Sequence, residues 1–451
     1  MNLRTALRIE PGDVVSLTGA GGKTSLMFRL AREIAEARLK VITTTTTKVG
    51  LPTSEQTPCF IVEPDREAML SSAAQALLDH AHVTVVCAPY ADGKFRGVPP
   101  DWVQDLRRLP DVHAVIVEAD GARKLPLKAP RDNEPVVPSD TTLLVVCAGL
   151  TAIGTSLDEE HVCRAEQVGR LTGMKPGDTV RAEHIAQVLA HPSGGTKGRP
   201  PQSRMIALLN QADSDERLSA AREVARRLHT TGRFDETCIG TLGASSPVLE
   251  RWGRATAVIM AAGEGRRFGA IKQMAPWRGT TYIEHAIQVA EQSQADEVLV
   301  VLGAHADQIR PTLKSMTTKT RIVMNERWLE GMSTSLIAGL GHTASKPSAL
   351  IFMNVDQPAV TPLLIDRLIA RHRVTGAAIV APRFQGMRGN PTLWDRSLFG
   401  ELRTLTGDVG GREILRQHWR DIAWIELDSE EELTDTDTPE EYQRLKEILR
   451  A

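Results

Sequence analysis

Short apolar runs alternate with longer stretches of helical periodicity along the whole chain. The runs are rich in Val, Ile and Leu and end at Gly, Pro, Asn or Asp, as in VVSLTG (14–19) and ALIFMNV (349–355). Unbroken apolar runs of this length are typical of strands buried on both faces. Between two of them, LMFRLAREIAEARL (26–39) repeats its apolar residues at helical spacing. The alternation predicts α/β architecture, with parallel sheets flanked by helices.

The expected strands form two series. They are 14–19, 40–46, 83–89, 113–119, 142–149 and 205–210 in the first half, and 257–262, 297–303, 321–325, 349–355, 377–382 and 422–427 in the second. The run ASSPVLERWGR (244–254) interrupts the alternation, and ATAVIMAAG (255–263) starts a new strand and glycine turn. A chain of 451 residues is too long for one ordinary core. We therefore expect two domains, residues 1–250 and 251–451.

Composition narrows the setting. The net charge of −2 provides no basic field, which argues against nucleic acid as a partner. No apolar run approaches the roughly 20 residues of a membrane span, and MNLRTALRIEPGD lacks the apolar core of a signal peptide. The five cysteines are scattered and form no C-x-x-C pair. These features predict a protein of the reducing cytoplasm.

A glycine-rich turn follows the first expected strand and opens a helix. In VVSLTGAGGKTSLMFRL, the backbone around Gly19 and Gly22 can surround a phosphate at the helix start. Lys23 would supply a charge and Thr24 a hydroxyl for Mg²⁺. The standard P-loop has a glycine where this chain has Leu17, so the spacing is that of the shorter Gly-x-x-Gly-Lys-Thr form. We favour a P-loop-like parallel sheet binding a second nucleoside triphosphate over an ordinary glycine turn.

Polar residues end two further strands of the first half. Glu118 and Asp120 follow the strand 113–119, at the edge where open α/β sheets gather ligands. They are candidates to hold Mg²⁺ or orient water, and the alternative is a charged turn. LLNQAD (208–213) contains an Asn-x-x-Asp pattern similar to the base-reading motif of GTPases, although such a tetrapeptide is also common by chance.

Several long strings of the first half point to one family. GAGGKTSLMFRLA, VITTTTTKV, VEADGARKLPLKAP, NEPVVP and LLNQAD occur in this order. Together they resemble the selenium-dependent hydroxylase accessory family of the YqeC type over residues 10 to 240. Cys163 stands where we expect that family to have histidine more often. The resemblance implies a setting, the maturation of molybdenum hydroxylases, and no particular reaction.

The second half opens with the strongest motif of the chain, AVIMAAGEGRRFGAIKQMAPWRGTTYIEHAI. A triphosphate carries about four negative charges that backbone donors, cations and a metal must meet before attack on the α-phosphate. Gly263, Gly265 and Gly269 let the backbone approach phosphates closely. Arg266 and Lys272 add positive charge beside them. The spacing Gly-x-Gly-x-x-x-Gly differs from the dinucleotide fingerprint Gly-x-Gly-x-x-Gly.

A single carboxylate ends a strongly apolar strand downstream. In ALIFMNVDQPAVTPLLI, Asp356 ends the strand and is followed by Pro358. The carboxylate is therefore expected at the carboxyl edge of the sheet. Mg²⁺ held there can bridge α-phosphate oxygens during an in-line displacement. The alternative is an aspartate in a turn. The glycine loop upstream favours the metal interpretation.

Further polar segments follow the expected strands. NERWLEGMSTSLIAGL (325–340) places Asn325 after a strand and Ser333 or Ser335 at a helix start, where capping is the alternative role. Asp435 and Asp437 precede a proline-started helix and either is a candidate metal ligand, with capping again the alternative. Two turn-rich segments, 388–395 and 405–416, carry Asn390, Asp408 and Arg412.

Residues 255–451 resemble the MobA-like nucleotidyltransferases, specifically the molybdenum cofactor cytidylyltransferases. The resemblance implies a Rossmann-like three-layer α/β/α fold, so that both domains are expected to be α/β/α. It implies that CTP and the molybdopterin cofactor give the cytosine dinucleotide cofactor and pyrophosphate. It places the nucleotide on Ala261, Ala262, Gly263, Gly265 and Gly269, with Asn325 nearby. It places Lys272 on the nucleotide and Asp356 on Mg²⁺. With the charge of Arg266, these are the expected catalytic residues, and Asp435 or Asp437 is a further candidate Mg²⁺ ligand from its position before the helix.

Two details bear on this resemblance. The guanylyl branch typically has glycine where this chain has Ala262, which favours CTP. The metal strand ends in Asn354-Val355-Asp356, in place of the commoner Gly-Asp. We expect a molybdenum hydroxylase apo-enzyme as partner. The alternatives are a nucleotidyltransferase for another phosphorylated acceptor and a chaperone that delivers the finished cofactor to such an apo-enzyme.

Overall fold

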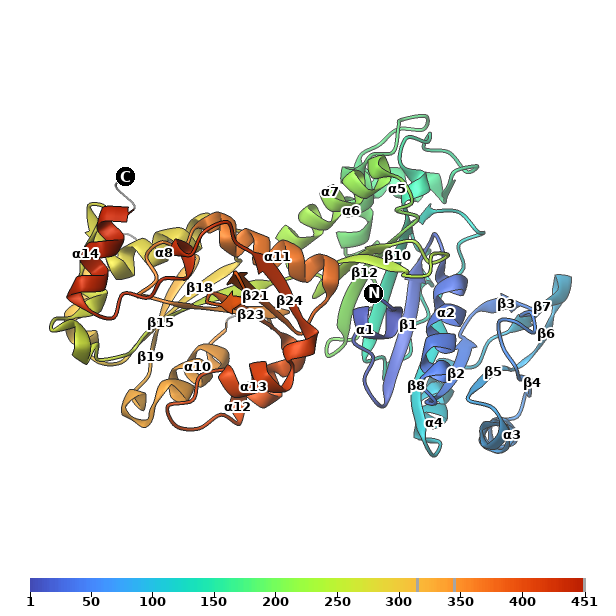
Figure 1. The fold of residues 1–451 in the computed structure, drawn as a ribbon. Helices are drawn as coiled ribbons and strands as arrows, with labels where there is room; N and C mark the ends of the chain where they lie inside the picture. The colour runs from blue at the N-terminus through green and yellow to red at the C-terminus, as the bar shows by residue number, and fades with distance from the viewer. Residues whose placement is uncertain (314–315, 344–345, 449–451) are drawn as a thin grey trace. The chain divides into compact units, whose positions relative to one another are not determined.

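The computed structural model describes residues 1–313, 316–343 and 346–448. It divides into two compact units, Met1–Trp252 and Gly253–Ala451. Each unit is a sheet with helices packed against it (Figure 1). The expected α/β class is confirmed. Within the described residues, no helix combines the length and apolar character needed to cross a membrane.

Unit 1 is built on a nine-stranded sheet with the order β14-β13-β12-β10-β1-β8-β2-β5-β4. Its strands are β1 (Asp13–Gly19), β2 (Lys40–Thr45), β4 (Phe60–Val62), β5 (His82–Val86), β8 (Val112–Glu118), β10 (Leu143–Gly149), β12 (Arg204–Asn210), β13 (Glu236–Gly240) and β14 (Val248–Gly253). The ladders between β13 and β4 are parallel, so the strands end at one common edge. Two small sheets are formed by β3 (Lys48–Gly50), β7 (Lys94–Arg96) and β6 (Ala88–Tyr90), and by β9 (Leu127–Lys128) and β11 (Val162–Cys163).

The helices of unit 1 cover both faces of this sheet. They are α1 (Leu3–Ala6), α2 (Lys23–Glu36), α3 (Arg66–Asp79), α4 (Val103–Arg108), α5 (Ala165–Thr172), α6 (Ala182–Ala190) and α7 (Asp215–Thr231). Alternate residues of β1 point to opposite faces, so Val15 and Leu17 pack with α2 while Val14 packs with α3 and α4. Burial on both faces explains why these strands are apolar throughout.

Helix α2 begins three residues earlier than its apolar periodicity predicts. Its N-cap is Gly22, whose φ of 132° ends the glycine turn directly at Lys23. The helix ends at Glu36, and Arg38 adopts a left-handed φ of 61° soon after. The lysine and threonine of the turn are therefore the first two helical residues, where backbone N–H groups are free of helical partners.

Unit 2 is built on an eight-stranded sheet with the order β19-β18-β15-β20-β23-β21-β22, and β24 also pairs with β21. Its strands are β15 (Ala255–Ala261), β18 (Glu297–Leu302), β19 (Thr320–Met324), β20 (Ala349–Asn354), β21 (Ile379–Phe384), β22 (Met387–Arg388), β23 (Thr392–Asp395) and β24 (Ile422–Glu426), beside the small ribbon of β16 (Pro276–Trp277) and β17 (Thr280–Thr281). The β19-β18-β15-β20 ladders are parallel, whereas β23 runs antiparallel to β20 and β21.

The antiparallel strand β23 corrects the expectation of parallel sheets for this unit. Residues 388–395 read as a turn-rich segment because they contain Gly389, Asn390 and Pro391. The last four of them nevertheless form a buried strand next to β20, in which Leu393 is fully buried. Backbone pairing with β20 and β21 decided this, and a short local window does not contain that information.

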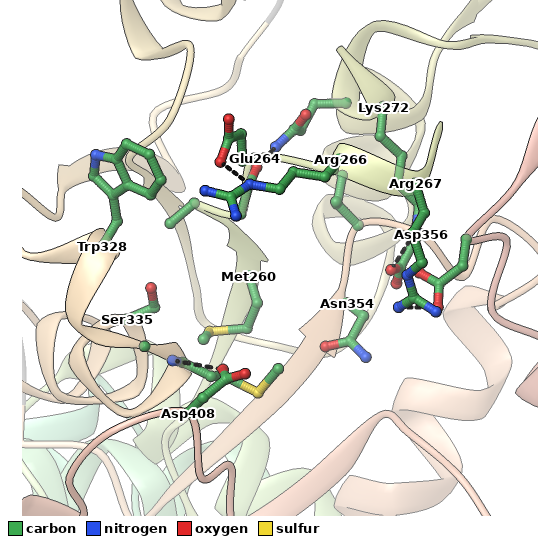
Figure 2. A pocket seen from close by; sticks show the side chains of 18 of the residues that line it. Met260, Glu264, Arg266, Arg267, Lys272, Trp328, Ser335, Asn354, Asp356 and Asp408 are labelled. Carbon is green, nitrogen blue, oxygen red and sulfur yellow. Dashed lines mark hydrogen bonds and ion pairs between the residues drawn. The ribbon is translucent and has the colours of Figure 1, made fainter. Parts of the chain in front are cut away.

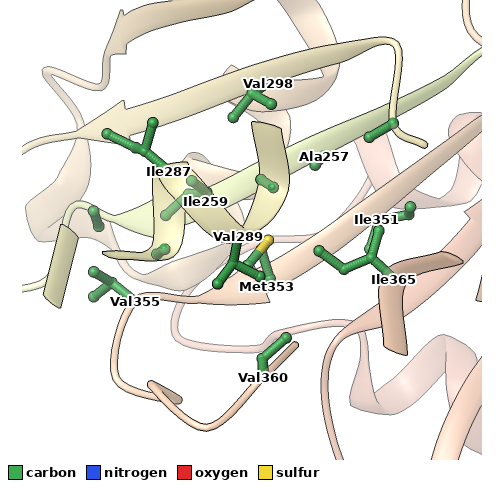
Figure 3. Close-up of a cluster of buried hydrophobic side chains, with 14 of the residues drawn as sticks. Ala257, Ile259, Ile287, Val289, Val298, Ile351, Met353, Val355, Val360 and Ile365 are labelled. Atoms are coloured by element: carbon green, nitrogen blue, oxygen red, sulfur yellow. The ribbon is translucent and has the colours of Figure 1, made fainter. Parts of the chain in front are cut away.

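The helices of unit 2 form two layers with separate cores. They are α8 (Tyr282–Gln292), α9 (Ala306–Ile309), α10 (Met332–Gly341), α11 (Pro362–Thr375), α12 (Phe399–Arg403), α13 (Arg412–Gln417) and α14 (Pro439–Ile448). Ala257 and Ile259 point to the face covered by α8 and α11, where Ile287 and Ile365 pack on them (Figure 3). Val258, between them, faces the layer that includes α10 and α12. Unit 2 is thus a three-layer α/β/α fold of the expected Rossmann-like kind.

Candidate active site

A cavity of about 600 Å³ opens in unit 2 where β15 and β20 end. Its lining includes the glycine loop after β15, the end of β20, the segment before α10 and one residue from the segment before α14. The lining residues are Met260, Ala262, Gly263, Glu264, Gly265, Arg266, Arg267, Lys272, Gln273, Trp328, Leu329, Glu330, Gly331, Met332, Ser335, Asn354, Val355, Asp356, Asp408 and Asp437. Figure 2 shows Lys272, Arg267 and Asp356 together on one side, with Trp328 and Asp408 on other walls.

The glycine loop is held from beneath by a buried amide. Gln273 donates from Nε2 to the carbonyl oxygens of Ala261, at 3.0 Å, and Gly263, at 2.7 Å. Gly265 has a left-handed φ of 67°, and an added Cβ would lie 3.2 Å from Cβ of Lys272. With these carbonyls bonded to Gln273, the loop is fixed as an exposed turn of backbone beside the cavity, the arrangement that phosphate binding needs.

Lys272 joins two carboxylates from distant parts of the chain. Its Nζ donates to Asp356 Oδ2 at 2.7 Å and to Asp437 Oδ1 at 2.8 Å. The lysine side chain is only 7% exposed, against 22% for Asp356 and 33% for Asp437. A buried ammonium is stable here because both neighbours are anionic. The carboxylates in turn face the cavity with more accessible surface than the lysine.

A buried hydroxyl positions both aspartates. Thr436 lies next to Asp437 and is fully buried. It donates from backbone N–H and from Oγ1 to the carbonyl oxygen of Asp356, each at 3.0 Å, and its Oγ1 also contacts the Tyr282 hydroxyl at 3.0 Å. The segment before α14 is thereby fastened to the end of β20. This contact between segments that are distant in the sequence brings Asp437 next to Asp356.

The charges of the cluster shift two carboxyl groups in opposite directions. The hydrogen bond from Lys272, together with its charge and that of Arg267, lowers the pKa of Asp437. Arg267 contacts the second oxygen of Asp437 at 2.7 Å. Asp435 is exposed as a whole residue, yet partial withdrawal of its carboxyl from water and the charges of Asp356 and Asp437 raise its pKa to about 6. Asp356, Asp435 and Asp437 therefore repel one another, and the positive charge of Lys272 offsets this repulsion in part.

The carboxylates of the cavity suit a Mg²⁺ ion that the protein and the phosphates of a bound substrate hold jointly. In the described residues, no three His, Cys, Asp or Glu side chains are arranged to hold a metal by themselves. Mg²⁺ typically binds one or two carboxylates together with waters and substrate phosphates, so a preformed cage is not required. Asp356 Oδ1 is buried and lacks a hydrogen-bond partner within the described part of the chain. A carboxylate oxygen without a protein partner, on a residue that lines one cavity with the glycine loop, fits the metal.

Asn325 lies behind the cavity wall and does not line it. It is buried and donates from Nδ2 to the hydroxyls of Thr334 and Ser335, each at 2.9 Å, while its Oδ1 accepts from the backbone of Arg327. Ser335 itself lines the cavity. The amide thus fastens the turn before α10 to the helix, and any contact of Asn325 with a nucleotide passes through Ser335.

The other predicted residues of unit 2 divide into two groups. Ala262, Gly263, Gly265, Arg266, Lys272, Asp356 and Asp437 line one cavity. Ala261 and Gly269 belong to the loop without lining it, and Asp435 stands beside Asp437. Arg266 pairs with exposed Glu264 at 2.7 Å. Their functional roles stay predictions.

Arg267, Gln273 and Trp328 were not identified from the sequence. Of this adjacent pair of arginines, Arg266 was expected beside the phosphates, and only the fold shows that Arg267 reaches Asp437. Trp328 packs where Gly303 comes close, since an added Cβ there would lie 2.6 Å from Trp328 Cβ. The sequence does not show that a glycine lies opposite an aromatic residue, because only the folded structure brings the two together.

The glycine turn of unit 1 also gathers charged residues. Lys23 Nζ donates to the Gly19 carbonyl at 2.7 Å and lies 3.2 Å from Asp120 Oδ1. Thr24 donates to Glu118 at 2.9 Å. Burial opposes the charge of Lys23, and the carboxylates of Asp120 and Glu118 outweigh it and raise the pKa of the lysine. The predicted loop and the predicted carboxylates therefore form one cluster.

Asp120 is shared between two lysines. Lys128 Nζ lies 2.7 Å from Asp120 Oδ2 and 3.1 Å from Glu134 Oε2, and is buried. Asp120 is 2% exposed, and its Oδ2 also accepts from the Gly19 N–H at 3.1 Å. Through these contacts Asp120 connects the glycine turn to the end of β8, whereas Glu118 accepts a hydrogen bond from the Thr24 hydroxyl. Metal binding by either carboxylate stays a prediction.

Comparison with known families finds one match in each half of the chain. The family model "YqeC protein" matches residues 15–166, and the model "MobA-like NTP transferase domain" matches residues 257–422. The uncharacterized protein YqeC of Escherichia coli K12 is 31% identical over 48% of this chain and 82% of that protein.

Two further relatives align with unit 2. The nicotine blue oxidoreductase of Paenarthrobacter nicotinovorans is 34% identical over 42% of this chain and 95% of that protein. A solved structure, the homologue of Mycobacterium tuberculosis Rv0371c from Mycobacterium sp. strain JC1, is 30% identical and covers 44% of this chain and 98% of that one, with a TM-score of 0.40. From the two family matches and the two curated relatives, the chain belongs to the YqeC family in its first half and to the MobA-like NTP transferases in its second, so unit 2 is a nucleotidyltransferase.

Proposed function

We propose that unit 2 transfers the cytidylyl group of CTP to the terminal phosphate of the molybdopterin cofactor. The observation that carries the proposal is the meeting of the glycine loop with Lys272, Asp356 and Asp437 in one cavity. Backbone N–H groups, a buried cation and two carboxylates are the parts that nucleotidyl transfer requires.

The reaction needs no nucleophile from the protein. An oxygen of the acceptor phosphate bonds to the α-phosphorus of CTP, the bond from this phosphorus to the bridging oxygen breaks, and pyrophosphate leaves. The loop 262–267 binds the triphosphate, and Lys272 neutralises charge on it while keeping Asp356 and Asp437 in place. Asp356 and Asp437 would hold Mg²⁺, which supplies charge neutralisation at the α-phosphate. Catalysis then consists of positioning and electrostatics.

The choice of substrates rests on the family resemblance and on one residue. Ala262 lines the cavity and is 4% exposed, and its methyl group occupies space that a glycine would leave open. This supports CTP over GTP. The molybdopterin acceptor and a molybdenum hydroxylase apo-enzyme as the recipient follow from the resemblance of both halves to molybdenum hydroxylase maturation. The free cysteines are consistent with action in the reducing cytoplasm.

Unit 1 is proposed to bind a second nucleoside triphosphate. The turn from Gly19 to Gly22, with Lys23 and Thr24 opening α2, supports phosphate binding at a helix start. In this proposal a phosphate replaces the Gly19 carbonyl as the partner of Lys23.

The test is pyrophosphate release by the full-length protein with CTP and purified molybdopterin cofactor. We expect release with Mg²⁺, loss of release after chelation, and less release with GTP. Release with sugar or alcohol phosphates but not with molybdopterin would assign another acceptor. Absence of release, together with retained binding of the finished cofactor, would favour the delivery chaperone.

A second candidate activity comes from the name of one relative. Nicotine blue oxidoreductase is 34% identical over 198 residues of this chain. Its name predicts oxidation or reduction of nicotine blue. The cluster of Lys272 with two carboxylates argues for phosphate chemistry instead. Measuring turnover of nicotine blue alongside pyrophosphate release distinguishes the two.

A further inference from the structure

A second cavity lies in unit 1 at the carboxyl edge of its sheet. Its volume is about 360 Å³, and it is bordered by α2 and by the segments that follow β12 and β13. Ser25 and Phe28 come from α2, Asn210 and Gln211 from the end of β12, and Thr241 and Leu242 from the end of β13. Ser25 directly follows the Lys23-Thr24 pair, so the cavity begins where the proposed phosphate site ends.

Asn210 connects the three segments around this cavity. Its Nδ2 donates to the Gly21 carbonyl at 2.7 Å, and its Oδ1 accepts from the Leu242 N–H at 3.0 Å. Asn210 is 7% exposed. A Cβ added to Gly22 would lie 2.5 Å from Asn210 Nδ2, so glycine is required for this approach. One amide thus ties the glycine turn to the loop after β13.

Two further groups shape the cavity. Arg29 of α2 donates to the carbonyl oxygens of Leu242, at 3.3 Å, and Ser245, at 3.0 Å, which keeps the loop after β13 against the helix. Thr241 Oγ1 is buried and lacks a hydrogen-bond partner among the described residues. Buried hydroxyls normally have a partner, so an unpartnered one at a cavity wall suits a polar ligand.

We infer that this cavity holds the nucleoside of the triphosphate proposed for unit 1, and that its base is guanine. The inference rests on that proposed nucleotide site. The cavity adjoins the glycine turn, has walls of mixed apolar and polar character, and lies at the sheet edge where α/β proteins bind ligands. Asn210 holds the base-proximal segments at a set distance from the phosphate turn.

In this inference Asp213 selects the base. It lies outside the residues that line the cavity in this structure, two positions after the lining residue Gln211 on the short segment that joins β12 to α7, and its side chain is 49% exposed. A carboxylate only accepts hydrogen bonds, and it accepts two when the donors lie side by side. Guanine presents two adjacent N–H donors on its pairing edge, whereas adenine presents one. Asp213 now pairs with Arg217 at the surface, an interaction weak enough for a base to replace.

The experiment is equilibrium dialysis of the full-length protein with labelled GTP, ATP and CTP. Binding that is lost in Lys23→Ala or in Thr24→Val defines the site of unit 1 and separates it from unit 2. We expect this fraction to prefer GTP over ATP and CTP by about 10-fold or more. Asp213→Asn should lower GTP affinity by a similar factor and raise affinity for xanthosine triphosphate. Glu216→Gln, an exposed carboxylate in the first turn of α7, is the matched control.

The possible outcomes separate the inference from the proposal beneath it. If the Lys23- or Thr24-dependent fraction binds all three nucleotides equally, the guanine assignment is wrong while the nucleotide site stands. If Asp213→Asn leaves a preference for GTP unchanged, the assignment of base selection to Asp213 is wrong. If no nucleotide binding depends on Lys23 or Thr24, the proposed site of unit 1 fails and the inference fails with it. The wild-type ranking of nucleotides decides the question even where one variant is unstable.

Discussion

Lys272 donates a 2.7 Å hydrogen bond to Asp356, which lies 84 positions further along the chain. The pair joins the end of the glycine loop to the end of the central strand β20. Lys272 is buried, and Asp356 lines the cavity where the substrate is expected. The two charges are therefore already in position before any nucleotide binds. Preorganised charge of this kind needs no rearrangement during the reaction.

Replacing Asp356 by Ala should abolish cytidylyl transfer in a folded protein. The change removes a carboxylate proposed to bind Mg²⁺, and a metal supplies several kcal/mol at a reacting phosphate, so kcat should fall by at least about 100-fold. Pyrophosphate release in saturating CTP and Mg²⁺ measures the effect. Asp307→Ala, an exposed aspartate of α9 outside the cavity lining, is the control. Near-normal turnover of Asp356→Ala would remove this residue from the mechanism.

Replacing Ala262 by Gly should relax the preference for CTP over GTP without inverting it. One methyl group in a binding pocket is worth about 1–3 kcal/mol of discrimination. The ratio of kcat/KM for CTP and GTP measures it. Ala304→Gly removes a methyl group of the same size from a residue that is equally buried but does not line the cavity. An unchanged ratio in Ala262→Gly would place base discrimination elsewhere, for example at Ser335.

Replacing Lys23 by Ala should weaken nucleotide binding by unit 1 and leave cytidylyl transfer almost unchanged. Lys23 begins helix α2 of unit 1, whereas Asp356 follows strand β20 of unit 2. Transfer kinetics of the full-length variant, with a thermal melt to check folding, test this independence. The variant should impair a later step, such as delivery of the cofactor to an apo-hydroxylase. Loss of transfer activity in a folded Lys23→Ala protein would contradict independent sites.

The stability of unit 1 should fall as the pH drops below about 6.5 because of His82. Burial lowers the pKa of this ring to about 4, and the ring contacts Thr43 Oγ1 at 3.0 Å. The unfolded chain, with its ordinary histidine pKa, binds the proton first, so acid favours unfolding. The contribution of neutral His82 to stability is complete above about pH 6.5 and is lost progressively down to about pH 4. The loss at pH 5 is about 2 kcal/mol.

Denaturant unfolding of wild type and His82→Gln at about pH 7.5 and about pH 5 tests this. Glutamine keeps a neutral polar group that does not titrate, so the variant should lose less stability between the two pH values. Carboxylates contribute equally to the pH dependence of stability in both proteins. The difference between the two stability losses therefore reports the titration of the His82 ring. Identical pH dependence would mean that His82 titrates normally in the folded protein.

Local pattern determined the strands and the turns that carry chemistry. Each expected run contains strand, because burial on both faces requires unbroken apolar runs. Most ends shift by one or two residues, and the run 83–89 is divided between β5 and β6, which belong to different sheets. The glycine turns also lie where predicted, after β1 and β15, since their left-handed backbone requires glycine at positions such as Gly19 and Gly265. Asp356 was visible as a carboxylate ending an apolar strand.

The assembly of the sites was decided by contacts between segments that are distant in sequence. Thr436 carries Asp437 to Asp356, Gln273 holds the glycine loop, and Asn210 joins a turn near residue 21 to a loop near residue 242. A buried amide or hydroxyl looks the same in the sequence whether it caps a helix or spans two segments. Its partner exists only after the sheet has formed. The sequence alone therefore determined most strands of the two large sheets and which residue types end them. The tertiary structure decided the strands that local pattern does not reveal, such as β23, and which of the polar residues meet, because hydrogen-bond partners are set by packing rather than by spacing.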